Sequence, residues 1–540
     1  MFVKRIILKK FGISYSSTGY FSDLVCDYLD NKKSLNSFFN SFPSYKNIYD
    51  QAAVKQKNFS NESRKALVKS LKKQYLGIDL SKEVKSNFDL LEGKSTFTIT
   101  TGHQLNIMTG PLYFIYKIIT AIKLSMELNK KYREIKFVPV YWMATEDHDF
   151  EEISFFVHKG KNYKWTKKNG SGPVGDILTD DLKDTLDLFE KELGNSPSAN
   201  QLKKLIKLSY RSGKKLSQAT RIFVNHLFGR FGLVIFDGND KNLKKNFTPH
   251  FQEEITKKTC HEYVTKQIYK LKEKYNTKYK PQINPREINL FHMAFGKRLR
   301  IIDDNSQSNK NEDVFYTYDF INEIKNYPER FSPNALMRPL YQEVILPNVA
   351  YVGGQAELAY WFQLKGLFDF KKIPFPLLCL RNSAVLIDSK SLVKLNKLGL
   401  KTQDLFLKKE VLAKEKVFEI SKINLDLSSL KKQLVDQFNY LEKIASKTDA
   451  SFLGALSAQK KKQLNGIKKL EKRLIKAEKI KFTDKLERLY AFRERFFPES
   501  NLQERVENFT TFYLQTGDYF FDILLDSFKP INHEFAFIQI

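Results

Sequence analysis

Five short apolar runs, each ending in polar or glycine-rich residues, constrain the fold of this chain more than any other feature. Segments with helical periodicity separate the runs. Strands that alternate with helices in this way favour a mostly parallel, doubly wound sheet. We therefore predict an α/β fold in which ligands bind beyond the carboxyl ends of the strands. The predicted strands are Phe97–Thr101, Phe137–Ala144, Leu233–Asp237, Ala350–Val352 and Leu377–Leu380.

The residues after the first run form the first candidate site. Pro111 suits the first turn of a helix, and free amides there, helped by Thr109, would hold an anion such as phosphate. Lys117 lies about two turns into that helix and is either an anion-binding cation that curls back or an ordinary surface lysine. The candidates from this segment are His103, Gln104, Thr109, Gly110, Tyr113 and Lys117.

The second run ends in TEDHDFEE, an acidic cluster that contains a histidine. Such a cluster suggests a divalent metal site or acceptors for an amine or hydroxyl-bearing substrate, and we favour the second. If the strand continues, neighbouring side chains point to opposite faces and cannot all meet one ion. If a helix begins after Ala144, some acids are electrostatic caps. The candidates here are Glu146, Asp147, His148 and Asp149.

The later runs add glycines and arginines. VGGQAELAYW places Gly353, Gly354 and Glu357 at a helix start, where backbone can approach a ligand closely. The pattern is neither a dinucleotide fingerprint nor a P-loop. Arg338 and Arg381 are possible forks for carboxylates, and a structural ion pair is the alternative for Arg338.

Composition narrows the class of protein. With 540 residues, the chain is long enough for more than one structural unit. A formal charge of +29 raises the question of a nucleic-acid partner. The lysines are spread along the chain and are densest in helical stretches such as residues 468–481, which is typical of solvated helix faces. We therefore do not expect a nucleic-acid partner, although part of this positive field can attract a small anionic substrate.

The sequence also bears on compartment. The segment MFVKRIILKKFG lacks a signal-peptide pattern, and no apolar run approaches the length of about 20 residues that a membrane helix needs. Cys26, Cys260 and Cys379 are far apart and form no CxxC pair, which argues against a disulfide framework or a zinc ribbon. We expect a soluble, cytoplasmic protein with no membrane partner and with Cys379 as inert core.

Outside the sheet, the pattern is mostly helical. The first 90 residues read as amphipathic helices that cap the core, and the polar region from His158 to about Ser217 reads as an insertion. Between Pro376 and Pro498, two apolar series with steps of three and four are separated by a break near 447–454. They predict two long helices in an antiparallel coiled-coil arm, for which dimerisation or scaffolding is favoured over substrate binding.

The longer motifs resemble one family. TGHQLNIMTGPLYFIYKIITAIKL, FVPVYWMATEDHDFEEI, RPLYQEVILPNVAYVGGQAELAYWFQLK and LQERVENF occur in this order along the chain. Together they closely resemble BshC, the cysteine-adding enzyme family of bacillithiol biosynthesis. The resemblance covers most of the chain. It implies a Rossmann-like core related to class I aminoacyl-tRNA synthetases, with connecting insertions and a helical coiled coil used for homodimerisation.

The resemblance also implies a reaction. The family joins L-cysteine to the amine of glucosaminyl-malate, and by analogy with the synthetases ATP with magnesium would activate the cysteine carboxylate. No tightly bound cofactor is expected. The chain departs from the synthetase pattern, because it has neither a HIGH tetrapeptide nor a KMSKS loop. His103 is the nearest candidate for a histidine that contacts phosphate.

Charge suggests a role for each candidate. Developing phosphate charge would be stabilised by His103, Gln104, Thr109 and the amide of Gly110. The attacking amine must lose a proton, to Glu146, Asp147 or His148 as base, or one of these holds the ammonium of cysteine. Arg338 and Arg381 would bind the malate carboxylates. The remaining substrate- or nucleotide-binding candidates are Tyr113, Lys117, Asp149, Gly353, Gly354 and Glu357.

The predicted organisation has three parts. Residues 1–385 form the Rossmann-like catalytic core with its helical cap and insertions at about 158–330, residues 386–497 form the coiled coil, and residues 498–540 pack back on the core. Two other functions compete with the ligase: a metal-dependent hydrolase built on Glu146–Asp149, and a basic nucleic-acid-binding or scaffold protein.

Overall fold

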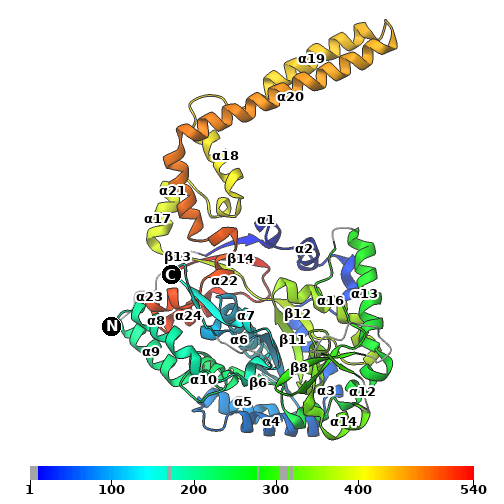
Figure 1. Ribbon diagram of the computed structural model, residues 1–540, viewed down its shortest axis with the longest axis vertical. Helices are drawn as coiled ribbons and strands as arrows, with labels where there is room; N and C mark the ends of the chain where they lie inside the picture. Colours follow the sequence, from blue (N-terminus) through cyan, green and yellow to red (C-terminus); the bar gives the residue numbers. More distant parts are fainter. Residues whose placement is uncertain (1–9, 167–171, 277–278, 303–313, 317–319) are drawn as a thin grey trace. The chain divides into compact units, whose positions relative to one another are not determined.

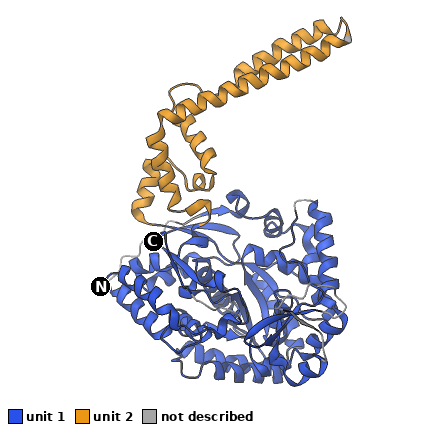
Figure 2. Ribbon diagram, in the orientation of Figure 1, with its two compact units in different colours: residues 1–387, 503–540 blue, residues 388–502 orange. Residues whose placement is uncertain are grey.

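The chain forms two compact units. The computed structural model describes residues 10–166, 172–276, 279–302, 314–316 and 320–540. The first unit comprises residues 1–387 and 503–540, and the second comprises residues 388–502 (Figure 2). The second unit is therefore inserted in the sequence of the first. The three-part division at 385 and 497 stays a prediction.

A five-stranded parallel sheet is the centre of the first unit. Its strand order is β12-β11-β2-β3-β6, and every neighbouring pair is parallel. Figure 1 labels three of these strands, β6, β11 and β12. The predicted doubly wound parallel sheet is confirmed, and all five predicted runs are its strands. The strands are β2 (Thr96–His103), β3 (Lys136–Met143), β6 (Val234–Asp237), β11 (Asn348–Gly353) and β12 (Leu377–Leu380).

The strand order creates a switch point between β2 and β11. The chain leaves β2 through α6 (Tyr113–Lys131) to β3 on one side, and β11 with β12 is added on the other. Ligand crevices in such sheets open at this point, beyond the carboxyl ends of the strands. Apolar side chains of the two central strands, α6 and α3 (Tyr45–Asn58) make up the core here, including Ile99, Val352, Leu124 and Ile48.

In the described part of the first 90 residues, the strand at residues 10–14 is followed by a mostly helical segment, which agrees with the predicted helices. Their helices begin at serine caps that accept hydrogen bonds from the first turn, for example Ser60 from the amide of Ser63 at 3.2 Å. The helices α3 and α5 contact strands of the central sheet. The helices of this part besides α3 are α1 (Tyr15–Thr18), α2 (Asp23–Leu29), α4 (Asn61–Gln74) and α5 (Lys82–Glu92).

The region after β3 contributes a hairpin, helices and a second sheet. The strand β6 lies within 158–330, so the central sheet interrupts the range predicted as insertions. Within the region interpreted as an insertion, residues 167–171 lie outside the described residues. The second sheet has the order β10-β7-β8-β9. The strands are β4 (Phe155–His158), β5 (Lys161–Lys164), β7 (Leu290–Ala294), β8 (Lys297–Ile302), β9 (Val314–Tyr316) and β10 (Phe331–Pro333). The helices are α7 (Phe150–Ile153), α8 (Lys183–Glu192), α9 (Pro197–Ser209), α10 (Leu216–Phe228), α11 (Lys241–Lys245), α12 (Thr248–Lys257), α13 (Thr259–Tyr275), α14 (Phe320–Asn326), α15 (Met337–Ile345) and α16 (Gln355–Lys371).

The end of the chain returns to the first unit. β1 (Lys10–Ser14) pairs antiparallel with β14 (Glu534–Gln539), which pairs parallel with β13 (Ala384–Ile387). Before β14 the chain forms three helices, α22 (Gln503–Val506), α23 (Thr510–Thr516) and α24 (Tyr519–Ser527).

The second unit contains the predicted antiparallel helix pair. α19 (Ser428–Ala445) packs along α20 (Ala450–Lys481), with Phe438, Ala445 and Leu456 buried between them. The interhelical ion pair of Lys431 with Glu471, at 2.6 Å, supports the same alignment. Homodimerisation through the arm stays a prediction. The other helices of this unit are α17 (Ser389–Lys397), α18 (Lys409–Ile420) and α21 (Thr483–Glu494).

No helix in the described part of the chain combines the length and the apolar character that a membrane crossing needs.

Candidate active-site cleft

A cleft of about 300 Å³ opens at the carboxyl ends of β2, β3 and β11. It lies where the strand order predicts a ligand crevice, and residues from both conspicuous motifs line it. Its wall also includes side chains from α15 and α16 and Arg298 of β8. The predicted candidates that line the cleft are His103, Gln104, Tyr113, Lys117, Glu146, Asp147, Arg338 and Glu357.

His103 is the last residue of β2 and is held as a neutral imidazole. Burial, followed by the charge of Lys117, lowers its pKa to about 3. Its Nδ1 lies 3.0 Å from the carbonyl oxygen of Gln104, so Nδ1 carries the proton and donates it. Nε2 is then a hydrogen-bond acceptor. An acceptor does not stabilise phosphate charge, so the geometry suits contact with an amine or hydroxyl instead.

Gln104 joins two carboxylates at one side of the cleft. Its Nε2 donates to Asp147 Oδ2 at 2.8 Å and to Glu152 Oε2 at 2.6 Å. Burial, opposed by the Gln104 hydrogen bond and reinforced by nearby Asp147 and Asp149, raises the pKa of Glu152. We call Gln104, Asp147 and Glu152 the acidic cluster. Its oxygens accept hydrogen bonds, and Glu152 is better prepared than an ordinary glutamate to take a proton.

The four residues Glu146–Asp149 do not converge. Glu146 pairs with buried Lys244 at 2.5 Å, and the Asp149 side chain caps α7 by accepting from the Glu152 amide at 3.2 Å. His148 is half exposed and packs against Phe291, outside the cleft. No group of three or more His, Cys, Asp or Glu side chains is arranged to hold a metal ion within the ranges that the structure describes.

The opposite side of the cleft is cationic. Lys117 is buried, and its Nζ donates to the carbonyl oxygen of Gly102 at 2.5 Å and to Glu357 Oε1. The alternative of an ordinary surface lysine is therefore wrong. Glu357 also accepts from the hydroxyl of Tyr351 at 3.3 Å and the amide of Gly354 at 3.2 Å. Lys117 thus reaches back over the end of β2, where its helix faces the sheet.

Arg338, in the first turn of α15, has neutral hydrogen-bond partners. Its Nη1 donates to Gln342 Oε1 at 2.9 Å, and its Nη2 donates to the hydroxyl of Tyr360 at 3.3 Å. The guanidinium lies 5.7 Å from the ring centroid of Trp142 and 5.9 Å from that of Tyr351. Guanidinium has five N–H donors, so donors remain for a ligand. No ion pair of Arg338 occurs among the described residues, and the structural-pair alternative finds no support.

Two predicted binding residues, Gly110 and Arg381, have structural partners instead, and a third, Thr109, is buried away from the cleft. The amide of Gly110 is not free, because it donates to the Ile107 carbonyl oxygen at 2.9 Å. Thr109 is buried and, with Gly110, lies outside the cleft lining. Arg381 is buried against Glu504, with Nη2 to Oε1 at 2.6 Å. The predicted anion cradle at the start of α6 and the predicted carboxylate fork at Arg381 are therefore corrected.

Gly353 and Gly354 also lie outside the cleft lining. A Cβ on Gly353 would approach Leu358 Cδ1 to 2.9 Å, so this glycine allows packing of α16 against β11.

The turn between β2 and α6 is held by the end of the chain. Met108 and Thr109 have positive φ angles of 51° and 68°, which are unfavourable for non-glycine residues. Asn508 Nδ2 donates to the carbonyl oxygens of Met108 and Gly110, at 2.8 and 2.5 Å. The amide of Leu112 donates to the carbonyl oxygen of Glu507 at 2.8 Å. The LQERVENF segment therefore braces the turn that follows His103 and Gln104.

Sequence reasoning missed several cleft residues. Glu152 lies within the TEDHDFEE motif, so its position after β3 was the available signal. Arg298 comes from the region interpreted as insertions and has no neighbouring motif. It donates to the Pro333 carbonyl oxygen at 2.8 Å, and its Nη1 lies 3.9 Å from Asp147 Oδ1. Tyr360 lies one to two helical turns after Gly353 and Gly354, on α16, and as an uncharged residue outside any motif it was not predicted.

Fold and cleft together define an α/β protein with a Rossmann-like sheet, a ligand cleft at its switch point and a separate helical arm. Comparison of the sequence with known families agrees with this class. Residues 8–382 match the family described as the N-terminal Rossmann-like domain of bacillithiol biosynthesis BshC. Residues 384–540 match its C-terminal coiled-coil domain. The chain belongs to the BshC family.

Similar proteins extend over nearly the whole chain. One from Flavobacterium johnsoniae is 47% identical over 98% of this chain and 99% of its own length. One from Flavobacterium psychrophilum is 46% identical over 98% and 99%. One from Christiangramia forsetii is 44% identical over 97% and 98%. All three carry the name "Putative cysteine ligase BshC".

Proposed function

We propose that this protein is the cysteine ligase of bacillithiol biosynthesis, which joins L-cysteine to the amine of glucosaminyl-malate. Membership of the BshC family and the names of its relatives support the reaction class. The observation that carries the proposal is the cleft itself, which has an acidic cluster on one side and, on the other, the Arg338 guanidinium, whose described hydrogen-bond partners are neutral. Glucosaminyl-malate has matching groups, an amine at one end and carboxylates at the other.

The acidic cluster would receive the amine. An ammonium group donates hydrogen bonds to carboxylates, and it must lose a proton before it can attack a carbonyl carbon. Glu152, whose pKa is raised by burial, would take that proton, while Asp147 and Gln104 hold the nitrogen in place. His103 Nε2 would accept a further hydrogen bond from the sugar. Compared with the sequence-based assignment, the base moves from the Glu146–His148 segment to Glu152.

The cationic side would bind the malate carboxylates. Arg338 forms no ion pair among the described residues, and both it and Lys117 line this side of the cleft. Guanidinium matches carboxylate geometry with two parallel hydrogen bonds. When a ligand displaces water from Arg338 and Lys117, the loss of hydration costs free energy unless the ligand places an anionic group there. A substrate lacking the carboxylates would therefore bind weakly.

ATP with magnesium is proposed as cosubstrate, because an unactivated carboxylate does not form an amide with an amine in water. When bound, ATP would supply a leaving group on the cysteine carboxylate, as in class I aminoacyl-tRNA synthetases, to which we propose the core is related. The amides of Gly110 and Leu112 already donate to the carbonyl oxygens of Ile107 and Glu507, so we assign no phosphate site at this turn. A cytoplasmic location and a homodimer formed through α19 and α20 complete the proposal.

The test is mass spectrometry of thiol products after incubation with glucosaminyl-malate, L-cysteine, ATP and magnesium, each omitted in turn. We expect a product with the mass of bacillithiol that requires every component. Arg338→Met should abolish it at limiting glucosaminyl-malate. Arg330→Met is the matched control, because Arg330 is exposed and pairs with Glu323 away from the cleft lining. Absence of product with the unmodified protein contradicts the proposed ligase.

The competing functions have less support. A metal-dependent hydrolase needs the Glu146–Asp149 side chains to share a ligand, and they have different partners. Among the described residues that line the cleft, Lys117 is the one lysine, and it is paired with Glu357, so the cleft does not favour a nucleic-acid partner over a small anion.

A further inference from the structure

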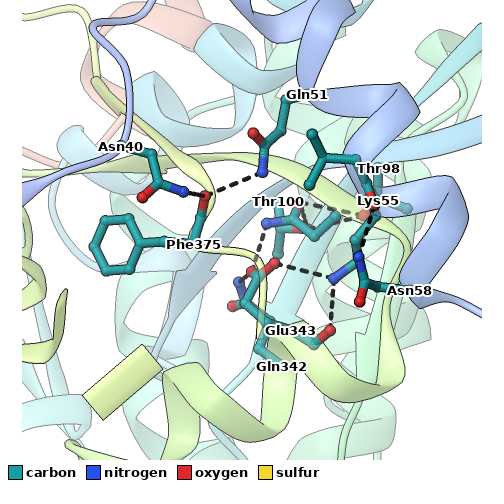
Figure 3. Close-up of polar contacts among 11 residues, drawn as sticks. Asn40, Gln51, Lys55, Asn58, Thr98, Thr100, Gln342, Glu343 and Phe375 are labelled. Carbon is teal, nitrogen blue, oxygen red and sulfur yellow. Dashed lines mark hydrogen bonds and ion pairs between the residues drawn. The ribbon is translucent and has the colours of Figure 1, made fainter. Parts of the chain in front are cut away.

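Behind Arg338 lies a buried polar network that the proposed function does not use. Lys55, Gln342 and Glu343 are all at most 2% exposed. They come from α3 and α15, which are far apart in sequence, and Figure 3 shows them meeting beside Thr98 and Thr100 of β2. Burying a lysine and a glutamate together gives little net stability, because the loss of hydration commonly equals or exceeds their attraction, so a buried pair suggests another role.

The network connects to the cleft through the amide of Gln342. Its Oε1 accepts from Arg338 Nη1 at 2.9 Å, and its Nε2 donates to Glu343 Oε1 at 2.9 Å. An amide turned by half a revolution would set N–H₂ against the guanidinium and oxygen against the carboxylate. Both contacts would then be repulsive. The Glu343 carboxylate therefore fixes which end of the Gln342 amide faces Arg338.

Glu343 is itself fixed from two further directions. Lys55 Nζ donates to the Glu343 carbonyl oxygen at 2.6 Å and lies 3.4 Å from Oε2. Asn348 Nδ2 donates to Oε1 at 2.7 Å, and Asn348 Oδ1 accepts from Thr100 Oγ1 at 2.7 Å. Burial lowers the pKa of Lys55 and raises that of Glu343, and the attraction between the two opposes both shifts. The pair neutralises charge without using Arg338.

This arrangement leaves Arg338 oriented but not neutralised. A carboxylate in direct contact would hold the guanidinium firmly and would also compete with an anionic ligand. A neutral amide accepts one N–H and forms no ion pair with the guanidinium, so it does not compete with an anionic ligand. The carboxylate that polarises the amide lies one residue further back, where Lys55 balances it.

We propose that Gln342, Glu343 and Lys55 are positioning residues that hold Arg338 in the geometry for binding a substrate carboxylate. The inference rests on the proposed function, because the ligand it assigns to Arg338 is the malate part of glucosaminyl-malate. It adds that carboxylate affinity depends on three buried residues that do not line the cleft.

The experiment compares two Gln→Met substitutions in the full chain. Gln342→Met keeps the side-chain length and removes the amide. Gln51→Met is the matched control, since Gln51 is also buried, lies one turn from Lys55 on α3, and donates to the Phe375 carbonyl oxygen at 3.1 Å (Figure 3). Calorimetry measures the binding of glucosaminyl-malate and of methyl glucosaminide, which lacks the carboxylates. Thermal unfolding confirms that each variant is folded.

We expect Gln342→Met to weaken glucosaminyl-malate binding about tenfold, equivalent to about 1.4 kcal/mol, and to leave methyl glucosaminide binding unchanged. Gln51→Met should change neither. A purely structural role would weaken both ligands together, and that result would overturn the inference. If Gln342→Met does not fold, Lys55→Met/Glu343→Gln takes its place, because it removes both charges at once, and the same selective loss is expected.

Two further outcomes separate the inference from the proposed function. If the unmodified protein binds glucosaminyl-malate and Gln342→Met and Lys55→Met/Glu343→Gln bind it equally well, the positioning role is wrong and the ligase proposal stands. If the unmodified protein does not bind glucosaminyl-malate, both are wrong.

Discussion

Replacing Lys117 by methionine should destabilise the first unit, and removing its partner as well should restore most of the loss. Lys117 is 2% exposed and Glu357 is 26% exposed. Breaking a fully buried ion pair costs about 3–5 kcal/mol, and we discount this to about 2 kcal/mol because water reaches Glu357. The lost hydrogen bond to the Gly102 carbonyl adds about 1 kcal/mol. Lys117→Met should therefore lower the free energy of unfolding by about 3 kcal/mol.

The double variant Lys117→Met/Glu357→Gln carries no unpaired charge. It should lose only about 1 kcal/mol, so it should be more stable than the single variant by about 2 kcal/mol. Ligase activity should be lost in both, because the charge beside Arg338 is gone. A mutation that improves stability without restoring activity separates the two roles of the pair.

Urea unfolding followed by tryptophan fluorescence suits this measurement. The three tryptophans of the chain are all buried in the first unit, so the signal does not depend on unfolding of the second. Lys123→Met is the control on the same helix, where a partly exposed pair with Glu127 at 3.7 Å should contribute less than about 0.5 kcal/mol. A double variant no more stable than Lys117→Met would refute the reasoning. The tryptophans are Trp142, Trp165 and Trp361.

Three further outcomes follow from the cleft and its support. The pKa of His103 is lowered from 6.5 to about 3, so the stability from its neutral form is complete above pH 6.5 and is lost as the pH falls towards 3. His103→Gln should therefore flatten the acid limb of the stability curve by up to about 1.4 kcal/mol per pH unit, and parallel curves would contradict it. Gln104→Leu removes the amide that donates to both Asp147 and Glu152, and should lower kcat/KM for glucosaminyl-malate about tenfold. An unchanged kcat/KM would exclude a role for the acidic cluster. Arg381→Met leaves buried Glu504 without its ion-pair partner and should lower the free energy of unfolding by about 3–5 kcal/mol. Molecules that remain folded should keep the KM for glucosaminyl-malate. A raised KM without a loss of stability would show instead that Arg381 binds the substrate.

The sheet was predictable because each of its strands is buried and therefore apolar. Phe97, Val140 and Leu378 belong to such runs, and their polar carboxyl ends indicated one common edge. The same rule predicted that Gln104 and Asp147 would lie in one cleft. Local sequence carries this information, because burial on both faces of a parallel strand leaves a continuous apolar signature.

The errors have a common physical cause, which is that partners distant in sequence decide what a polar group does. Gly110 looked like a free amide donor, and Ile107 accepts its hydrogen. Arg381 looked like a substrate fork, and Glu504 from the far end of the chain neutralises it. The sequence around Lys117 did not indicate that α6 is buried along most of its length, so it did not decide whether Lys117 lies at the surface. Helical periodicity predicts which face of a helix packs against the core, but it does not predict how much of the rest of the helix is buried.

The brace formed by residues 503–508 has a consequence for how the protein is made. Asn508 and Glu507 supply the hydrogen bonds that hold the turn after Gln104, and they follow the second unit in the sequence. On the ribosome, the segment bearing His103 therefore emerges long before its supports. A nascent chain stopped before residue 503 would contain every side chain of the cleft and still leave that turn unsupported. Ligand binding should accordingly begin only after residues 503–508 have been synthesised.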